Sequence, residues 1–431
     1  MIARTLTILF CSVLFAAAAQ AQTFSNLYSF CSKSQCSDGT RPQYGLVADS
    51  AGNLYGTATS VVFELSPNGG GWTYSVIHVF CTQPSCSSGF TPSGPLTIDT
   101  AGNLYGVTLQ GGKTSDGIAY ELMPQGGGQW KFVLMHSFCR HSACIDGRGP
   151  SGTLAYLGQR SGAAYDGSSP LYGTTANGGL YGQGTVFTLT PPPPGGRSWW
   201  KARTLFSFCH EGGNCLADGG APLTGVVVDS RNTLFGTTLI GGQNASGTVF
   251  RLDRLRHGGS GWHEQVLYNF CSLGRCADGQ SPTALAENDA GELIGGTTLG
   301  PHKPGCVRQA CGTIFKLVPQ TDAFTTLHTF CSETDCADGG GPGPVRILDN
   351  GDLIGVAERG GDSANIAGGG GVLYRLSGTT LTVLHDFCGS AACADGAFPS
   401  GGVSIDGQGR MFGTTFGGGT ANIGTIFEFA P

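Results

Sequence analysis

The sequence predicts an all-β protein, a seven-bladed β-propeller with four strands in each blade. A strand end of the form aliphatic-x-x-Phe-Cys recurs seven times, at Phe30-Cys31, Phe80-Cys81, Phe138-Cys139, Phe208-Cys209, Phe270-Cys271, Phe330-Cys331 and Phe387-Cys388. Each repeat contains four short runs of β-favouring residues, separated by turns rich in Gly, Pro, Asn and Asp. Four strands in each of several repeats is the pattern of a propeller.

The composition agrees with short strands joined by tight turns. Glycine accounts for 74 of the 431 residues, and only 12% of the residues are charged. This excludes the signature of disorder, which is low hydrophobicity with high charge. A β-helix is the alternative fold, although its coils are normally shorter than these repeats. The net charge of −6, without a cluster of Lys and Arg, argues against a nucleic-acid partner.

The N-terminus has the features of an export signal. Arg4 precedes an apolar run from Leu6 to Ala19, and Ala19-Gln20-Ala21 has the small-x-small form of a cleavage site. We therefore interpret residues 1–21 as a signal peptide and residues 22–431 as a single propeller domain. The apolar run is short for a bilayer span. We expect a monomer that is secreted or periplasmic and has no membrane span.

The two ends of the mature chain predict how the ring closes. Residues 23–31 form a lone fourth strand, and the chain finishes after the third strand of its last repeat. We expect residues 23–31 to join the sheet of residues 398–431. A shared blade would complete the count of seven and would remove exposed sheet edges.

The repeat resembles one known family. The run from Asp99 to Leu122 contains Asp-x-x-Gly-Asn-Leu-Tyr-Gly, a Gly-Gly loop and a third strand, and degraded copies fill essentially all of the mature chain. This run is similar to the GloVer tandem repeat of secreted bacterial proteins. The resemblance implies export and a repeat array. It implies no established activity and no catalytic residues.

Sixteen cysteines remain after removal of Cys11 in the signal peptide, and they fall into eight close pairs. The pairs are Cys31/Cys36, Cys81/Cys86, Cys139/Cys144, Cys209/Cys215, Cys271/Cys276, Cys306/Cys311, Cys331/Cys336 and Cys388/Cys393. An even number in an exported protein predicts disulfides, most simply one within each loop. The alternative, zinc binding, would require two pairs to converge on one ion. We expect neither a metal nor a cofactor.

The strand order predicts which loops share a face. Loops from a fourth strand to the next first strand carry the cysteines, and loops between second and third strands are glycine-rich. Both kinds belong to one face, which is our candidate binding surface. The insertion at residues 300–311 also belongs to this face, whereas the insertion Gly158–Pro170 and the proline run Pro191–Pro194 belong to the opposite one. Exposed aromatic residues such as Phe90, Tyr181 and Phe416 could stack on sugars.

An Asp-Gly step follows the second cysteine in six repeats, and Ser88 replaces the aspartate in the other. The candidate ligand-binding residues are Asp38, Asp146, Asp218, Asp278, Asp338 and Asp395. They could form a ring of acceptors for sugar hydroxyls or for Ca²⁺. The structural interpretation is that each aspartate caps its turn and that glycine supplies the positive φ. We favour the structural interpretation, because a ligand rarely needs six symmetric copies of one contact.

Four histidines stand two residues before the Phe of the Phe-Cys pair, at His78, His136, His328 and His385. The other repeats have Tyr28, Phe206 and Tyr268 there. Because a position that accepts Phe is an aromatic packing position, we expect these histidines to be structural.

Catalysis has little support in the sequence. The innermost strands present small or apolar residues to the channel, with Glu287 and Arg346 as isolated exceptions. No Gly-x-Ser-x-Gly motif is present. We expect a binding or scaffold module for an extracellular glycan or surface protein, and we expect no catalytic residues. The alternatives are an extracellular carbohydrate-active hydrolase or lyase, and a purely structural envelope protein.

Overall fold

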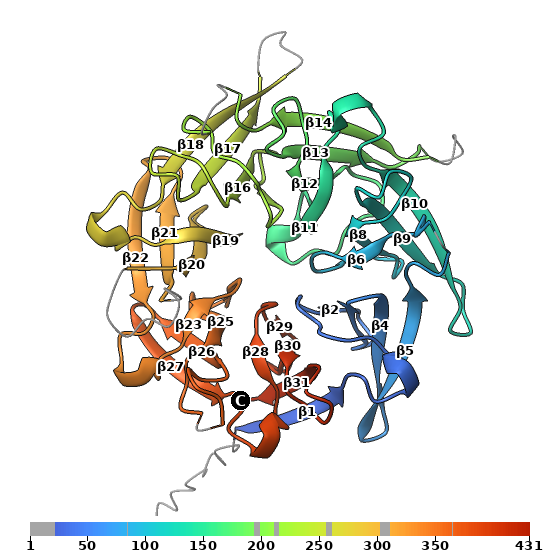
Figure 1. The fold of residues 1–431 in the computed structure, drawn as a ribbon, viewed down its shortest axis with the longest axis vertical. Helices are drawn as coiled ribbons and strands as arrows, with labels where there is room; N and C mark the ends of the chain where they lie inside the picture. Colours follow the sequence, from blue (N-terminus) through green and yellow to red (C-terminus); the bar gives the residue numbers. More distant parts are fainter. Residues whose placement is uncertain are drawn as a thin grey trace, which may run out of the picture.

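The protein is described here from a computed structural model that covers residues 22–83, 85–193, 199–210, 215–255, 261–301, 311–363 and 365–431. Seven antiparallel sheets stand around a central opening, and the chain passes from one sheet to the next around the ring (Figure 1). The prediction of a seven-bladed propeller is confirmed. In the described part of the chain, no helix has the length and apolar character of a membrane span.

The strands of a blade follow one another from the innermost to the outermost. Blade 1 has β2 (Val47–Ala48), β3 (Leu54–Ala58), β4 (Val61–Asn68) and β5 (Gly71–Val79). Blade 2 has β6 (Phe90–Pro92), β7 (Thr97–Ile98), β8 (Leu104–Gln110), β9 (Ile118–Pro124) and β10 (Trp130–Ser137). Blade 3 has β11 (Arg148–Tyr156), β12 (Leu171–Asn177), β13 (Thr185–Thr190) and β14 (Lys201–Ser207). Blade 4 has β15 (Val226–Val228), β16 (Leu234–Thr238), β17 (Thr248–Arg254) and β18 (Trp262–Asn269).

The remaining blades repeat this order. Blade 5 has β19 (Gln280–Glu287), β20 (Leu293–Leu299), β21 (Thr313–Val318) and β22 (Ala323–Thr329). Blade 6 has β23 (Gly340–Pro342), β24 (Arg346–Ile347), β25 (Leu353–Arg359), β26 (Val372–Ser377) and β27 (Thr380–Asp386). Blade 7 has β28 (Ala397–Pro399), β29 (Ser404–Ile405), β30 (Met411–Gly417), β31 (Thr425–Ala430) and β1 (Thr23–Ser29). Short 3₁₀ turns are η1 (Ser34–Cys36), η2 (Ser142–Cys144), η3 (Gln159–Ser161), η4 (Gly274–Cys276), η6 (Thr334–Cys336) and η7 (Ala391–Cys393).

The ring closes as the two chain ends predicted. Strand β1 pairs antiparallel with β31, with Phe24 opposite Phe429 and Ser29 opposite Thr425. Figure 1 shows this contact between the blue and red ends of the chain. The outermost strand of blade 7 therefore comes from residues 23–29, whereas its other strands come from residues 397–430.

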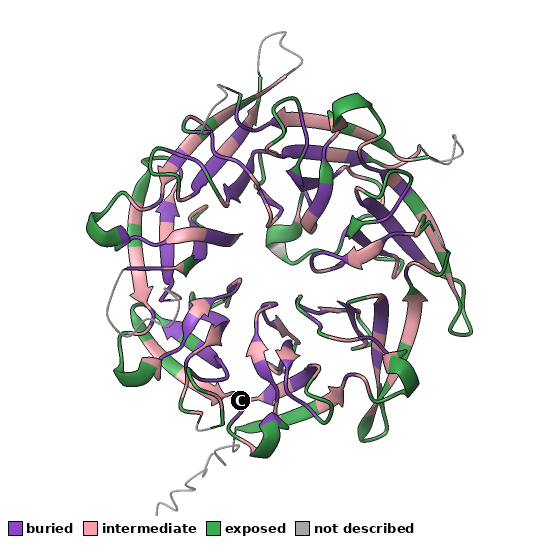
Figure 2. Cartoon of the chain, in the orientation of Figure 1, coloured by how far each residue is buried: buried purple, intermediate pink, exposed green. Residues whose placement is uncertain are grey.

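The core repeats one aromatic contact seven times. The Phe of each Phe-Cys pair is at most 2% exposed. Each packs edge-to-face on an aromatic ring in the third strand of the next blade, with ring centroids 4.9–5.3 Å apart: Phe30–Phe63, Phe80–Tyr120, Phe138–Phe187, Phe208–Phe250, Phe270–Phe315, Phe330–Tyr374 and Phe387–Phe427. Such pairs contribute about 0.5–1.5 kcal/mol beyond burial. Figure 2 shows the buried residues concentrated inside the blades and the half-buried ones along the outermost strands.

The glycine of each Leu-Tyr-Gly-like second strand makes room for that ring. A Cβ on Gly56 would lie 2.6 Å from Phe63, and one on Gly236 would lie 2.5 Å from Phe250. The recurring glycine is thus required by packing inside each blade.

The cysteine loops and the glycine-rich loops lie on one face, as expected. The second glycine of a Gly-Gly loop donates its N–H to the carbonyl of the second cysteine in the adjacent loop. This bond joins Gly112 to Cys86, Gly179 to Cys144, Gly242 to Cys215, Gly361 to Cys336 and Gly419 to Cys393 at 2.8–3.0 Å. We call this side of the ring the cysteine-loop face.

Candidate functional site

The inner ends of the seven blades enclose a central cavity of about 830 Å³. Small and apolar residues of the innermost strands form most of its wall, including Val47, Ile98, Thr153, Ala284 and Val403. Edge strands leave part of their backbone N–H and C=O groups unpaired, so such a wall offers hydrogen bonds as well as apolar contact. Arg346 and Glu358 are the charged residues among the described residues of this wall.

Glycines let neighbouring blades meet tightly around this cavity. A Cβ on Gly94 would lie 2.4 Å from the carbonyl oxygen of Gly152, and one on Gly152 would lie 2.3 Å from the nitrogen of Gly225. Across the ring closure, a Cβ on Gly401 would lie 2.4 Å from the backbone of Tyr44. The wall is rigid because backbone packs directly on backbone there.

The insertion between β11 and β12 narrows the end of the cavity away from the cysteine-loop face. Its η3 turn stands in the central opening (Figure 1), and Gln159 and Gly162 line the cavity. Arg160 reaches blade 5, where its guanidinium lies 3.1 Å from Oε1 of Glu287. The insertion thus spans the opening from blade 3 to blade 5.

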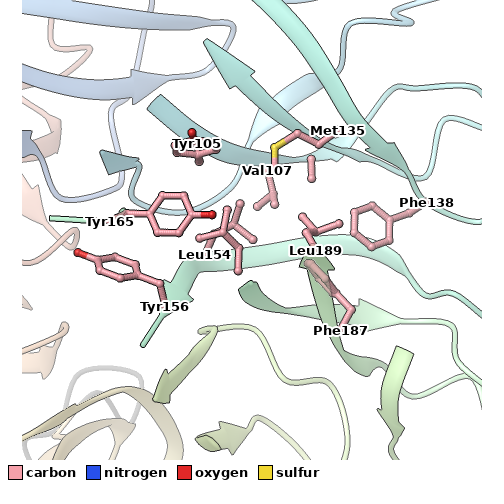
Figure 3. Close-up of a cluster of buried hydrophobic side chains, with 11 residues drawn as sticks. Tyr105, Val107, Met135, Phe138, Leu154, Tyr156, Tyr165, Phe187 and Leu189 are labelled. Carbon is pink, nitrogen blue, oxygen red and sulfur yellow. The ribbon is translucent and has the colours of Figure 1, made fainter. Parts of the chain in front are cut away.

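An aromatic cluster anchors the other end of this insertion. Tyr165 is fully buried and packs on Tyr105 and Tyr156, with ring centroids 5.2 and 5.3 Å apart (Figure 3). Its backbone also pairs with Ile98 and Thr100 of blade 2. The insertion at this end of the cavity is therefore held on one side by blade 5 and on the other side by blade 2.

The two charged residues predicted to face the channel have different roles. Arg346 is exposed and lines the cavity, as predicted. Glu287 is not among the described lining residues. Burial raises its pKa, while the hydrogen bond and charge of Arg160 oppose that rise. Glu287 serves to hold the insertion.

Aligning the repeats at the mouth reveals one position with left-handed backbone in all seven blades. This residue precedes a proline and is Arg41, Thr91, Gly149, Ala221, Ser281, Gly341 or Phe398, with φ of 49–63°. In five blades its N–H donates to a carbonyl of the preceding blade, as from Arg41 to Ile423 and from Phe398 to Gly370. Left-handed backbone costs a residue other than glycine about 1–2 kcal/mol. Glycine in two blades shows that the fold requires no side chain there.

Two large side chains nevertheless occupy this strained position on either side of the ring closure. Arg41 is exposed, and its guanidinium carbon lies 5.3 Å from the ring centre of Phe416. The guanidinium carbon of Arg359 lies 5.5 Å from the ring centre of Phe398. Arg359 also pairs with Glu358 at 3.4 Å. We call these five residues the mouth cluster.

Glu358 is the member of the mouth cluster that lines the cavity, and the other four occupy or adjoin repeat positions that line it in other blades. Ser281 and Gly341 occupy the same repeat position as Arg41 and Phe398, and both line the cavity. Leu239, Thr298 and Glu358 occupy the repeat position of Phe416, and they also line it. The two phenylalanine rings are partly exposed. The cluster therefore presents aromatic rings and guanidinium groups next to the opening on the cysteine-loop face.

The six aspartates predicted as possible ligands stay apart, one in each cysteine loop. Their carboxylates bond within their own loops: Ser32 N–H to Asp38, Arg140 N–H to Asp146, His210 N–H to Asp218, Ser272 N–H to Asp278, Ser332 N–H to Asp338 and Gly389 N–H to Asp395, at 2.9–3.3 Å. Burial raises the pKa of Asp38, Asp146 and Asp338, but hydrogen bonds with the Tyr28, His136 and His328 side chains and with the loop backbone outweigh it, so each pKa is lowered. This geometry matches the turn-capping interpretation, and we place no ligand on these aspartates.

The residue two positions before the Phe completes each loop. Tyr28 and Tyr268 donate their hydroxyls to Asp38 and Asp278 at 2.7 and 2.8 Å, and His136 and His328 lie 3.1 and 3.2 Å from Asp146 and Asp338. In four blades the ring also stacks on an aromatic ring of the next blade: Tyr28–Tyr74, His78–Phe132, Tyr268–Phe324 and His385–Phe24. These side chains join blades, as the packing interpretation predicts.

The loop from blade 1 to blade 2 lacks this acceptor, because Ser88 replaces the aspartate. Nε2 of His78 and Oγ of Ser88 are buried, and neither has a hydrogen-bond partner among the described residues. Burial lowers the pKa of His78 to about 4. This imidazole is consequently neutral near pH 7.

Seven of the predicted cysteine pairs form disulfides within their own loops. They are Cys31–Cys36, Cys81–Cys86, Cys139–Cys144, Cys209–Cys215, Cys271–Cys276, Cys331–Cys336 and Cys388–Cys393. Cys311 is also disulfide-bonded, and its predicted partner Cys306 lies outside the described residues, as do residues 1–21 and most of the insertion at 300–311. Cysteine sulfurs do approach one another at Cys311, Cys331 and Cys336, but disulfide sulfurs are not thiolate ligands.

Sequence reasoning named Phe416 but missed Arg41, Arg359 and Phe398. A signal for two of them was present. A proline follows the left-handed position in every repeat, and an alignment on that proline shows Arg41 and Phe398 as the large residues in the series.

Solved structures share this fold at low sequence identity. Virginiamycin B lyase from Staphylococcus aureus aligns at 13% identity and a TM-score of 0.54, over 95% of this chain and 99% of that one. YCF48 from Cyanidioschyzon merolae aligns at 16% identity and a TM-score of 0.52, over 95% and 99%. The extracellular domain of a proposed one-component system from B. thetaiotaomicron aligns at 11% identity and 0.51, over 94% of this chain and 39% of that one.

No curated protein matches the sequence. The Gloeobacter/Verrucomicrobia repeat matches it over residues 58–304, 159–361 and 263–431, which together span well over half of the chain. The predicted resemblance is confirmed, and the protein belongs to the Gloeobacter/Verrucomicrobia repeat family.

Proposed function

We propose that this protein binds an extracellular carbohydrate chain at the mouth of its central cavity, on the cysteine-loop face. The observation that carries the proposal is the mouth cluster, where the rings of Phe398 and Phe416 are partly exposed and Glu358 lines the cavity. Pockets of this kind combine apolar contact with a few placed polar groups. The cavity wall adds threonine and serine hydroxyls, as at Thr298 and Ser400.

The disulfides support an extracellular location. Seven small disulfide loops are typical of a protein from an oxidising compartment. Each closes a short loop, which in the chain-entropy model contributes about 2 kcal/mol. The stapled loops hold the residues around the mouth on a rigid frame.

The fold alone does not choose between binding and catalysis, since the similar structures include a lyase and an extracellular domain. The lining residues decide our choice. Among the described residues that line the cavity, Glu358 is the one carboxylate, whereas glycoside hydrolysis ordinarily needs two that flank the scissile bond. A binding role needs no such pair.

Blocking the mouth tests the proposal. Thr298 lines the cavity and is exposed, so Thr298→Trp would fill the entrance. Thr325→Trp, on the exposed side of β22 in the same blade, is the matched control. Binding to a panel of soluble polysaccharides would be measured by affinity electrophoresis and calorimetry.

We expect the wild-type protein to bind at least one polysaccharide of the panel. Thr298→Trp should weaken that binding about tenfold or more, and Thr325→Trp should leave it unchanged. Failure of every polysaccharide to bind, or equal binding by both variants, would refute the carbohydrate site.

A further inference from the structure

We propose that the carbohydrate recognised at this mouth is acidic, with carboxylate or sulfate groups on its sugar rings. The inference rests on the proposed function and specifies the ligand class. It depends on the three arginines around the cavity, at positions 41, 346 and 359.

The first argument is the departure from the repeat. The left-handed position needs only a backbone N–H, and glycine fills it in blades 3 and 6. Arg41 and Phe398 make the contact between blades through their backbone N–H groups, so the fold does not need their large side chains for it. The left-handed backbone is common to all seven blades, and the departure from the repeat is that these two positions carry large side chains on either side of the ring closure.

The second argument is the pairing of ring and cation. Arg41 lies over Phe416 and Arg359 lies over Phe398, each within the range of a cation–π contact. The contact holds each guanidinium beside a ring edge that remains partly exposed. A sugar ring against the phenylalanine would bring an anionic substituent within reach of the adjacent guanidinium. Arg can bind a carboxylate or a sulfate ester through two parallel hydrogen bonds.

The third argument is charge. The protein as a whole carries −6, yet the mouth cluster and the cavity wall hold Arg41, Arg346 and Arg359 against the single carboxylate of Glu358. Three positive charges and one negative charge leave an excess of +2. Within the described part of the chain, Arg41 and Arg346 have no ion-pair partner, whereas Arg359 pairs with Glu358 at 3.4 Å. Arg346, Glu358 and Arg359 belong to blade 6, and Arg41 belongs to the loop from β1 to blade 1.

The positions of these arginines also suit a chain rather than a single sugar. Arg346 pairs in the sheet with Ile354, and β25 continues from there to Arg359 at the mouth. Five residues of strand span about 17 Å. A ligand that touches both arginines must therefore be an oligosaccharide or longer.

The test uses two matched pairs of polysaccharides and a set of variants in which glutamine replaces one arginine. Polygalacturonate is compared with its methyl-esterified form, and dextran sulfate is compared with dextran. Polyglutamate is the anionic probe without sugar rings. Wild type is compared with Arg41→Gln and Arg359→Gln, and Arg254→Gln removes an exposed arginine at the far end of β17 as the control.

We expect one acidic polysaccharide to bind at least tenfold more tightly than its neutral partner. Arg41→Gln and Arg359→Gln should each weaken it about fivefold or more, while Arg254→Gln should have no effect. Tighter binding of polygalacturonate would identify carboxylate as the recognised group, and tighter binding of dextran sulfate would identify sulfate.

Three results would overturn the inference. They are equal binding of both members in each pair, wild-type affinity in the two mouth variants, and equally tight binding of polyglutamate. If a neutral polysaccharide binds and Thr298→Trp abolishes that binding, the carbohydrate site stands and only its acidic preference is wrong. If no polysaccharide binds, the proposed function itself is wrong.

Discussion

At the scale of the residue, single positions of the repeat show how the fold and the site share one sequence. The position two residues before the Phe accepts Tyr, His or Phe, because its main contact is a ring on the next blade. The polar end of this side chain forms a hydrogen bond only where the loop supplies an aspartate. His78 faces Ser88 instead, and its imidazole therefore stays neutral and without a partner.

This difference predicts how stability depends on pH. The folded pKa of His78, about 4, lies below the unfolded value of about 6.5. On acidification the unfolded state takes up the proton first, so stability is complete above about pH 6.5 and is lost as the pH falls toward 4. We expect His78→Phe to reduce the fall in Tm between about pH 7 and about pH 5.

The control is the same substitution at His328, which lies 3.2 Å from Asp338. His328→Phe should lower Tm already at neutral pH, since it removes a hydrogen bond from a buried carboxylate. Thermal unfolding by circular dichroism at both pH values measures this. An unchanged pH dependence in His78→Phe would show that this imidazole is not buried as described.

At the scale of the element, the insertion between β11 and β12 determines the shape of the cavity. Its ends are fixed by Tyr165 in the aromatic cluster of Figure 3 and by the ion pair of Arg160 with Glu287. Ordinary turns at this point of the repeat are short and are closed by one side chain, as where Asp49 accepts the N–H groups of Ala51 and Asn53 at 2.9 Å. The insertion is instead held by contacts with two other blades, blade 2 and blade 5.

Removal of the aromatic anchor should release this element. Tyr165→Ala leaves a large cavity in a packed cluster and should cost about 3 kcal/mol of unfolding free energy. Tyr181→Ala, at a tyrosine that is 47% exposed, should change stability by less than about 0.5 kcal/mol. Denaturant unfolding gives both values.

Limited proteolysis provides a second measurement of the same change. The Tyr165→Ala variant should be cut between residues 157 and 170 faster than wild type, because the segment has lost its buried contact. Equal cleavage rates in wild type and in the Tyr165→Ala variant would mean that the ion pair of Arg160 with Glu287 alone holds the insertion.

At the scale of the whole molecule, ring closure brings together residues that are far apart in the sequence. The pairing of β1 with β31 sets blade 1 beside blade 7, and the loop that follows β1 carries Arg41 to Phe416. The closure is held without a covalent link between the two strands. The stability of the ring and the assembly of the mouth therefore depend on the same contact.

A variant without residues 22–29 should expose β31 as an unpaired edge with its buried Phe427 and Phe429. We expect a lower Tm and self-association in size-exclusion chromatography, since free edges pair with other chains. A synthetic peptide of residues 22–29 should restore the monomer by strand addition, and a scrambled peptide should not. A variant that stays monomeric with an unchanged Tm would contradict closure by β1.

The sequence by itself determined the blades, the closure and the disulfide pairs, because each depends on residues that recur at equivalent places in every repeat. The Phe of Phe-Cys, the glycine of the second strand and the loop cysteines could all be assigned in this way. For the site, the sequence predicted only a face of the ring, and the residues of the site proposed on that face were largely not predicted. The candidate aspartates recur because each loop needs a cap, so their symmetry pointed to structure and away from a ligand.

Only the tertiary structure decided which exceptions to the repeat meet. Arg41, Arg359, Phe398 and Phe416 come from three blades and from both ends of the chain, and no local pattern relates them. Their proximity follows from the closed ring and from left-handed backbone that directs two of the side chains toward the mouth. A repeat fixes local geometry many times over, whereas contacts across the closure depend on the geometry of all seven blades together.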